Sequence, residues 1–310
     1  MTVISGDGQH SNSRPRGFKS AAALCVAALA FAATAGANTS NGYNLPPGVT
    51  DLSRDMYALH MEVFWICVGI AIVVFGAMIY SLLKFRKSQG AVADTTMVHS
   101  TKVEIIWTIV PVVILVVMAI PAAELILKME DSRNSGLSIR VTGYQWKWEY
   151  QYMDAAEGID FFSTLARASN FARELHSGVD PNTVENYLLD VDKPLVIPSG
   201  TKVRLLLTSQ DVIHAWWVPD FGAKRSAIPG YVNELWFKVD AGKEGTYRGQ
   251  CAALCGRDHG FMPVVVTVLT PDDFKKWVAD QKAALQQPAA AGQATSPEAR
   301  APRTAQVVSN

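Results

Sequence analysis

The residues best suited to metal chemistry lie in one short stretch and one upstream position. Two cysteines, Cys251 and Cys255, are followed by His259 and Met262, so that four donor side chains fall within twelve residues. A second histidine, His214, stands upstream beside a tryptophan pair. Together these residues offer two thiolates, two imidazoles and a thioether. Soft sulfur combined with imidazole favours copper or zinc over hard cations.

Several kinds of site are compatible with this set. A disulfide between Cys251 and Cys255 is permitted in an exported domain, a structural zinc site would use two Cys and two His, and buried Cys and Met also serve simple packing. Zinc, however, has no use for Met262, and His259 stands between the sulfur residues. A blue-copper site takes two His, one Cys and a weak Met. The extra cysteine favours two thiolates that bridge two metals, which predicts a dinuclear copper site.

The elements that must position these residues are predicted to be short strands. The segments are β-branched and aromatic, and Pro and Gly punctuate them, which is typical of an antiparallel sandwich or barrel. The donor residues lie at the junctions of such segments. The expected strands are 138–152, 194–198, 202–208, 232–239, 245–250 and 263–269.

Three further segments complete the predicted C-terminal half. Two of them, an insertion and a helix, belong to a domain over 129–285, and the third is a tail that follows this domain. The stretch 155–190 interrupts the strand pattern with an amphipathic helical segment and is predicted to be an insertion. Thr270 and Pro271 are typical of the start of a helix, which we expect to end near Leu285. From residue 286 to residue 310 the chain consists largely of Pro, Ala, Gly, Gln and Ser, which predicts a flexible tail.

The N-terminal half differs from the C-terminal half in its content of apolar residues. Charged residues make up only 18% of the 310 residues, with 28 basic against 28 acidic, whereas an average soluble domain has ~25% charged residues. This balance excludes a disordered chain and broad binding to nucleic acid. The apolar surplus is concentrated in blocks, which indicates membrane segments.

Two uncharged blocks, 63–83 and 105–123, predict a transmembrane hairpin within the segment 38–128. A span of 21 residues reaches roughly 31 Å, enough for a bilayer core of about 30 Å. Pro111 and Pro121 are tolerated in a membrane helix that has neighbours. The alternative is a pair of buried helices in a soluble protein, but uncharged runs of this length are rare in globular cores.

Charges near the spans predict the orientation. Basic residues gather in the connecting loop, which should therefore remain on the cytoplasmic side. Residues 1–37 have a basic start, a short Ala-rich core and small residues at the end, as in a secretory signal peptide. Both observations place the C-terminal domain outside the cytoplasm.

The chain resembles subunit II of the haem-copper cytochrome c oxidases, over roughly residues 41–284. The resemblance rests on four stretches: Glu104-Ile-Ile-Trp107-Thr-Ile-Val-Pro111, Gly143-Tyr-Gln-Trp146-Lys-Trp148, Ala227-Ile-Pro-Gly230 and the Cys251–Met262 loop. It implies a bacterial protein of the inner membrane, with two membrane helices before an all-β, cupredoxin-like Greek-key sandwich or barrel on the periplasmic side.

The resemblance also implies the site. The family's dinuclear copper centre, called CuA, takes its ligands at positions that match His214, Cys251, Cys255, His259 and Met262, with the backbone carbonyl of Ala253 as the sixth. Trp146 matches the aromatic residue that passes electrons from cytochrome c to copper. Glu104 matches the mouth of a proton path into subunit I, and Asp211 an acid of the face that docks cytochrome c.

Two positions depart from the family pattern. Ala253 stands where relatives carry a glutamate whose side chain binds magnesium or manganese at the interface with subunit I. Ser226 replaces an acidic residue usual before Ala-Ile-Pro-Gly. Copper needs only the carbonyl of Ala253, so we expect copper binding to persist and the hard-cation site to be weak or absent.

The predicted function follows from this resemblance. The chain is expected to take electrons from cytochrome c and pass them to a haem in subunit I, where oxygen is reduced with proton pumping, in a complex with subunits I and III in the lipid bilayer. It should not be active alone. The alternatives are a membrane-tethered protein that binds or delivers copper, and a quinol oxidase subunit II, which lacks the copper ligands.

Overall fold

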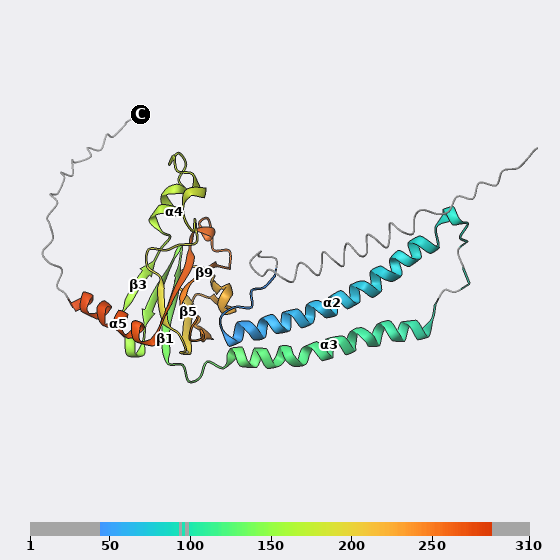
Figure 1. The fold of residues 1–310 in the computed structure, drawn as a ribbon, viewed down its shortest axis with the longest axis horizontal. Helices are drawn as coiled ribbons and strands as arrows, with labels where there is room; N and C mark the ends of the chain where they lie inside the picture. Colours follow the sequence, from blue (N-terminus) through green and yellow to red (C-terminus); the bar gives the residue numbers. More distant parts are fainter. Residues whose placement is uncertain (1–43, 93–94, 97–98, 287–310) are drawn as a thin grey trace, which may run out of the picture. The chain divides into compact units, whose positions relative to one another are not determined.

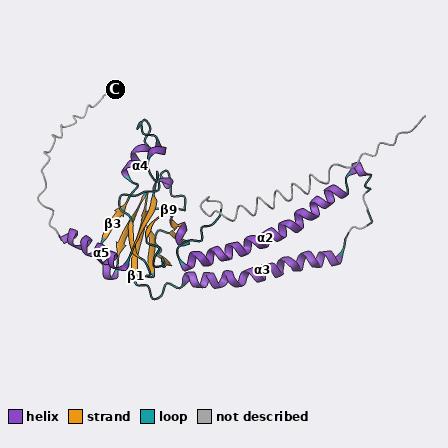
Figure 2. Ribbon diagram, viewed as in Figure 1, coloured by secondary structure: helices purple, strands orange, loops and turns teal. Residues whose placement is uncertain are grey.

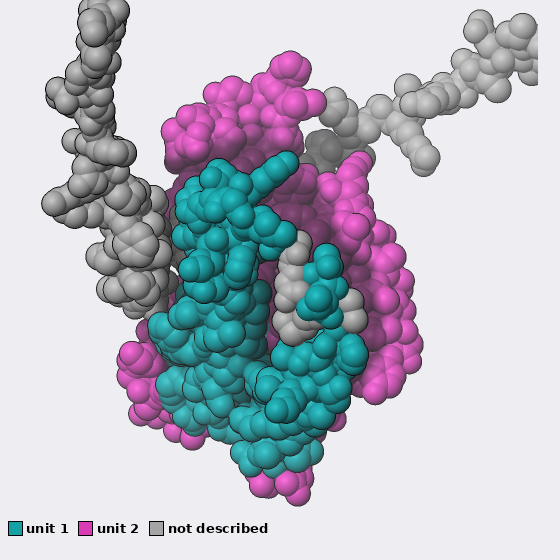
Figure 3. Space-filling view, turned by 90° about the vertical axis from the view of Figure 1, so that its right-hand side faces the viewer, with its two compact units in different colours: residues 1–131, 218–223 teal, residues 132–217, 224–310 magenta. Residues whose placement is uncertain are grey.

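The computed structural model describes residues 44–92, 95–96 and 99–286. The chain divides into two compact units, residues 1–131 with 218–223 and residues 132–217 with 224–310 (Figure 3). The predicted signal peptide and the predicted tail from residue 287 onward lie outside the described residues, so both stay predictions.

The first unit is built on two long helices, α2 (Asp51–Lys84) and α3 (Thr101–Glu130) (Figure 1). They contain the predicted spans 63–83 and 105–123. Their 34 and 30 residues correspond to lengths of about 51 and 45 Å, which exceed the bilayer core. Both helices are long and apolar enough to cross a membrane, and no residue of either apolar stretch is buried. A helix that is apolar on all sides and unburied needs lipid or other protein around it.

The two helices form an antiparallel pair. Lys128, near the end of α3, makes an ion pair with Asp55, near the start of α2. The helix α3 continues through Pro111 and Pro121. The start of α2 is fixed by Thr50, whose hydroxyl accepts a hydrogen bond from the Ser53 backbone at 2.9 Å and satisfies one free N–H of the first turn.

The second unit is a sandwich of two five-stranded sheets, with strand orders β3-β2-β1-β5-β8 and β4-β10-β9-β6-β7 (Figure 2). The strands of the first sheet are β1 (Leu137–Tyr144), β2 (Lys147–Tyr152), β3 (Asp160–Ser163), β5 (Val203–Ser209) and β8 (Asn233–Phe237). Those of the second are β4 (Leu195–Pro198), β6 (His214–Val218), β7 (Ala223–Ala227), β9 (Gly245–Cys251) and β10 (Pro263–Leu269). The predicted sandwich is thus confirmed, although β1 pairs with β5, and β4 with β10, in parallel.

Aromatic side chains join the two sheets. Trp216 of β6 stacks on Phe237 of β8, with ring centroids 5.8 Å apart and an angle of 5° between the rings. The Trp216 indole also donates a hydrogen bond to the Tyr150 hydroxyl of β2 at 3.3 Å. These side chains are buried and span the core, so they fix the strand that carries His214 against the opposite sheet.

The predicted single strand 138–152 is wrong. The structure has a hairpin, in which Tyr144 of β1 pairs with Lys147 of β2 and a two-residue turn contains Gln145 and Trp146. Neither turn residue is the Gly or Asn that usually marks such a turn. The sequence therefore shows no break between the two strands, and its aromatic pattern predicts a single strand. Trp146 therefore lies in the turn at the end of the two strands, while Trp148 is fully buried in β2.

The predicted helical insertion is only partly helical. Residues 160–163 form the edge strand β3, and the helix α4 covers only Arg167–Ala172, followed by a 3₁₀ turn at Pro181–Thr183. The phenylalanines of β3 pair with β2, and these cross-strand contacts outweigh local helical propensity. The C-terminal helix α5 (Pro271–Gln286) begins where it is predicted to begin. The Thr270 hydroxyl caps it by accepting a hydrogen bond from the Asp273 backbone N–H at 3.2 Å.

Candidate metal centre

The loop between β9 and β10 carries most of the predicted donor residues. Cys251 ends β9, Cys255 lies in the loop, His259 begins the short 3₁₀ turn η6 (His259–Phe261), and Met262 precedes β10. The Cys251 backbone N–H donates to the Met262 carbonyl at 3.3 Å. This bond closes the base of the loop, so its donor side chains are held above the end of one strand pair.

His214 reaches the loop because β6 runs beside β9. Trp216 of β6 lies opposite Cys251, and the Ala252 backbone N–H donates to the Ala215 carbonyl at 2.9 Å. His214 is the first residue of β6. The register of this pairing is what brings a residue far upstream to the cysteines.

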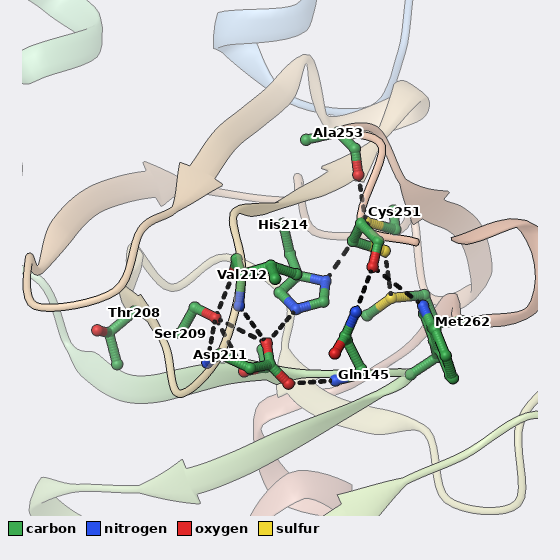
Figure 4. Close-up of polar contacts among 12 residues, drawn as sticks. Gln145, Thr208, Ser209, Asp211, Val212, His214, Cys251, Ala253 and Met262 are labelled. Carbon is green, nitrogen blue, oxygen red and sulfur yellow. Dashed lines mark hydrogen bonds and ion pairs between the residues drawn. The ribbon is translucent and has the colours of Figure 1, made fainter. Parts of the chain in front are cut away.

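The six predicted donors form one continuous cluster, of which Figure 4 labels His214, Cys251, Ala253 and Met262. The two cysteine sulfurs are 3.8 Å apart, and both cysteines are free, so no disulfide joins them. His214 Nδ1 lies 3.9 Å from Cys251 Sγ, and the Ala253 carbonyl oxygen 3.4 Å from the same sulfur. His259 Nδ1 and Met262 Sδ each lie 3.5 Å from Cys255 Sγ. Each histidine thus lies beside a different cysteine sulfur.

The cluster is shielded from water. His214 is 0% exposed, and Cys251, Cys255 and Met262 are also buried. His259 and Ala253 are partly exposed. Such a site excludes competing water ligands, and its packed walls hold the donors in place.

The electrostatics of the cysteines favour a bound cation. Burial disfavours the thiolate of Cys251, but the contacts with His214 and with backbone groups outweigh burial and lower its pKa to about 6. Burial and the negative charge of Cys251 raise the pKa of Cys255 to about 12. Without a cation, therefore, only one of the two sulfurs ionises readily. A site that is to hold two thiolates needs positive charge between them.

Asp211 has a structural role that sequence reasoning missed. Its carboxylate lies 2.9 Å from His214 Nε2 and accepts hydrogen bonds from the backbone N–H groups of Val212, at 2.6 Å, and Gln145, at 2.7 Å. A carboxylate on the second ring nitrogen fixes the tautomer and orientation of a metal-binding histidine. Its predicted role in docking a partner stays a prediction.

The hairpin turn supports the loop from another direction. Gln145 Nε2 and Trp146 Nε1 both donate to the Cys255 carbonyl, at 2.8 and 3.2 Å. Gly143 lies under His214, because a Cβ atom there would stand 2.7 Å from His214 Cδ2. Gln145 and Gly143 belong to the stretch 143–148 that carries the resemblance, but sequence reasoning gives a role only to Trp146. Glu104 lies in the first turn of α3 and is not part of this cluster.

The donor set fits copper better than the alternatives. His214, Cys251 and Cys255 have donor atoms within 4.8 Å of one another, whereas His259 falls outside this group. A single tetrahedral zinc ion would require all four Cys and His donors around one point. Thiolate, imidazole and thioether donors together suit soft metal ions, and copper above all.

Comparison with known proteins assigns both halves of the chain. Residues 38–125 match the family "Cytochrome C oxidase subunit II, transmembrane domain", and residues 137–269 match "Cytochrome C oxidase subunit II, periplasmic domain". A "Probable cytochrome c oxidase subunit 2" of Rickettsia bellii is 36% identical over 235 residues, which cover 76% of this chain and 82% of the relative. A "Cytochrome c oxidase subunit 2" of Arabidopsis thaliana is 33% identical, over 75% of this chain and 86% of the relative.

A solved structure also matches part of the chain. It is the periplasmic domain of subunit II of cytochrome oxidase of Bradyrhizobium japonicum, with 37% identity and a TM-score of 0.42, over 49% of this chain and 98% of that one. The family matches, and relatives that are covered over 82% and 86% of their length, agree with the helix pair, the sandwich and the donor cluster. The chain therefore belongs to the cytochrome c oxidase subunit II family, as the subunit with two membrane-spanning helices and an exported cupredoxin-like domain through which electrons enter this haem-copper oxidase.

Proposed function

We propose that the loop cluster holds two copper ions as a CuA centre, with His214, Cys251, Cys255, His259, Met262 and the Ala253 carbonyl as ligands. The observation that carries this proposal is the arrangement of the donors, with the two sulfurs in the middle and one histidine beside each. Two thiolates between two histidines can bridge two ions. A mononuclear site would have no use for the second thiolate. A copper pair bound there would accept and release one electron at a time.

The protein's own residues prepare the site for fast electron exchange. Asp211 orients His214, and Gln145 and Trp146 hold the Cys255 carbonyl. Burial of the sulfurs excludes water. A centre whose ligands are fixed in this way changes little in geometry when its charge changes, which keeps the reorganisation on electron transfer small.

Trp146 is the proposed path into the centre. It is half-buried at the turn between β1 and β2, so part of its ring is accessible to a partner while its indole N–H contacts the Cys255 carbonyl. The proposed donor is cytochrome c, whose docking would be steered by acidic groups such as Asp211 and weakened by salt.

The proposed acceptor is the haem of subunit I, where oxygen is reduced and protons are pumped. Glu104 is proposed to stand at the cytoplasmic mouth of a proton path into that subunit, and subunit III and the lipid bilayer complete the surroundings. The proposed location is the inner membrane of a bacterium, with the β-sandwich in the periplasm.

Metal content of the purified oxidase and of its exported domain tests the proposal. We expect two copper ions per chain and an electron paramagnetic resonance spectrum in which one unpaired electron is shared by both. One copper ion, or zinc, would contradict the dinuclear site. Copper without electron transfer from reduced cytochrome c would favour the copper-delivery alternative, and absence of copper with quinol oxidation would favour a quinol oxidase.

A further inference from the structure

The insertion between β3 and β4 forms a closed loop on the sandwich, and the proposed function gives it no role. Its two ends are joined at the base, where Leu165 bridges to Val191 and the Ala166 backbone N–H donates to the Asp190 carbonyl at 2.9 Å. The Ser169 hydroxyl, inside the loop, accepts from the Leu188 backbone at 3.1 Å. The insertion is therefore an ordered projection with its own internal hydrogen bonds.

One side chain of the insertion contacts the loop Cys251–Met262, called the copper loop from here on, at two points. Arg173 follows α4, and its guanidinium lies 4.4 Å from the centre of the Phe261 ring. The same group is 3.4 Å from the Asp258 carboxylate, and its Nε donates to Asn170 Oδ1 at 2.8 Å. The side chains of Arg173 and Asp258 are only 28% and 13% exposed, so this pair is better shielded from solvent than a surface ion pair.

The two contacts enclose a proposed copper ligand. Asp258 directly precedes His259, and Phe261 follows it by two residues. The Phe261 backbone N–H donates to the Asp258 carbonyl at 2.9 Å, so these residues form one turn that carries the His259 ring. A guanidinium that binds both ends of this turn restricts its rotation, and with it the direction of the imidazole.

The other ion pair that this turn makes is more exposed to solvent. Arg257 also approaches Asp258, at 3.4 Å, but it is 80% exposed, and exposed ion pairs contribute little. A cavity of about 160 Å³ lies beside the turn, lined in part by Trp146, Arg173 and Phe261.

We propose that Arg173 is a positioning residue for the copper centre, which fixes the His259 end of the site through Asp258 and Phe261. The insertion thereby serves as a brace for the half of the loop that is not held by Gln145 and Trp146. This inference rests on the proposed function, because it assumes that His259 binds copper.

The test uses the purified oxidase with substitutions at four positions. Arg173→Ala removes both contacts, and Arg173→Lys keeps the charge for Asp258 but loses the planar group over Phe261. Arg167→Ala removes an exposed charge from the same helix, and Ser169→Ala loosens the insertion without touching the copper loop. The readouts are the rate at which a copper chelator removes copper, the reduction potential of the centre and the copper hyperfine pattern.

We expect Arg173→Ala to release copper about tenfold faster, at the lower end of the effect of groups that support metal ligands, and to shift the potential and the hyperfine pattern. Arg173→Lys should fall between Arg173→Ala and the unmodified oxidase. Arg167→Ala and Ser169→Ala should match the unmodified oxidase. Asp258→Asn should also release copper faster. Arg173→Ala should raise the release rate less in the Asp258→Asn variant than in the unmodified oxidase.

Two results would overturn the inference. In the first, Arg173→Ala keeps the release rate, the potential and the spectrum of the unmodified oxidase. In the second, Ser169→Ala changes them as much as Arg173→Ala, which would assign the effect to the integrity of the insertion. Failure of the proposed function is a separate outcome, because the unmodified oxidase would then lack a copper pair altogether.

Discussion

The two cysteines of the copper loop differ in their surroundings although both point at the same space. Cys251 is paired with His214 and Cys255 with His259 and Met262. If each sulfur bridges two ions, neither can be replaced by a weaker, harder donor. Cys251→Ser and Cys255→Ser should each lower the copper content from two ions to one or none and abolish the shared-electron spectrum. A variant that keeps two coupled copper ions in electron paramagnetic resonance would exclude the bridging role.

Met262 is expected to tune the centre more than to hold it. A thioether is a weak ligand in related copper sites, and it donates electron density that favours the oxidised ion. Met262→Leu conserves the volume of a fully buried side chain. We expect both coppers to remain and the reduction potential to rise by about 59 mV, the equivalent of a tenfold change in a one-electron equilibrium. Spectroelectrochemistry measures the shift, and complete loss of copper would contradict the assignment.

Strand β1 contributes to the site through a residue without a side chain. An added Cβ at Gly143 would lie 2.7 Å from His214 Cδ2, whereas one at Gly260 would meet nothing within 4 Å. Gly143→Ala should therefore push His214 away from the sulfurs and weaken copper binding about 10- to 100-fold, as for other changes around metal ligands. Gly260→Ala, beside the proposed ligand His259, is the matched control and should bind copper normally. Copper titration of the exported domain compares them, and equal affinities would exclude the steric argument.

Which elements can be predicted from sequence depends on how local their signals are. The membrane spans, β10 and the start of α5 follow from composition and from residues within one turn or one strand. The β1–β2 turn, the strand β3 and the contact of Arg173 with the copper loop depend on pairing between distant segments. No local residue marks them, so the sequence pattern predicts one long strand and one longer helix in their place.

The donor residues themselves are predictable because metal chemistry restricts residue types. Cysteine, histidine and methionine at close spacing have few other uses, so their spacing in the sequence is enough to indicate a soft-metal site. The supporting residues have no such signature. The resemblance includes both Asp211 and Gly143, but their residue types do not reveal that they support His214. A carboxylate or a glycine acquires this role only from the register that places it against His214.

At the scale of the assembled oxidase, Ala253 predicts the loss of a second metal. Copper requires only its carbonyl oxygen, which already points at Cys251. Magnesium or manganese requires hard oxygen ligands, and Ala253 provides no carboxylate. We expect the purified oxidase to retain no manganese after growth with manganese and dialysis, and Ala253→Glu to raise its retention while copper content stays unchanged. A strong bound manganese resonance in the unmodified oxidase would show that other residues replace the carboxylate.

The orientation of the whole chain is a separate prediction. Basic residues between α2 and α3 should hold this loop in the cytoplasm, so both the start of α2 and the end of α5 should be outside. Alkaline phosphatase, which is active only after export, should be active when fused after Gln286 and inactive when fused after Gly90. The reverse pattern would contradict the proposed topology.

The parallel pairing of β1 with β5 and of β4 with β10 also determines the order of events during biogenesis. Leu137 pairs with Val203, and Leu195 with Val266, so each sheet is completed only when residues far apart in the sequence have both been exported. The donor loop lies between β9 and β10, almost at the end of the domain. Nascent chains emerging one segment at a time thus present no assembled ligand set until translation of the sandwich is nearly finished. If the sandwich folds on the outer side of the membrane, as proposed, we expect copper binding to follow translocation and folding, on that side and on a finished domain.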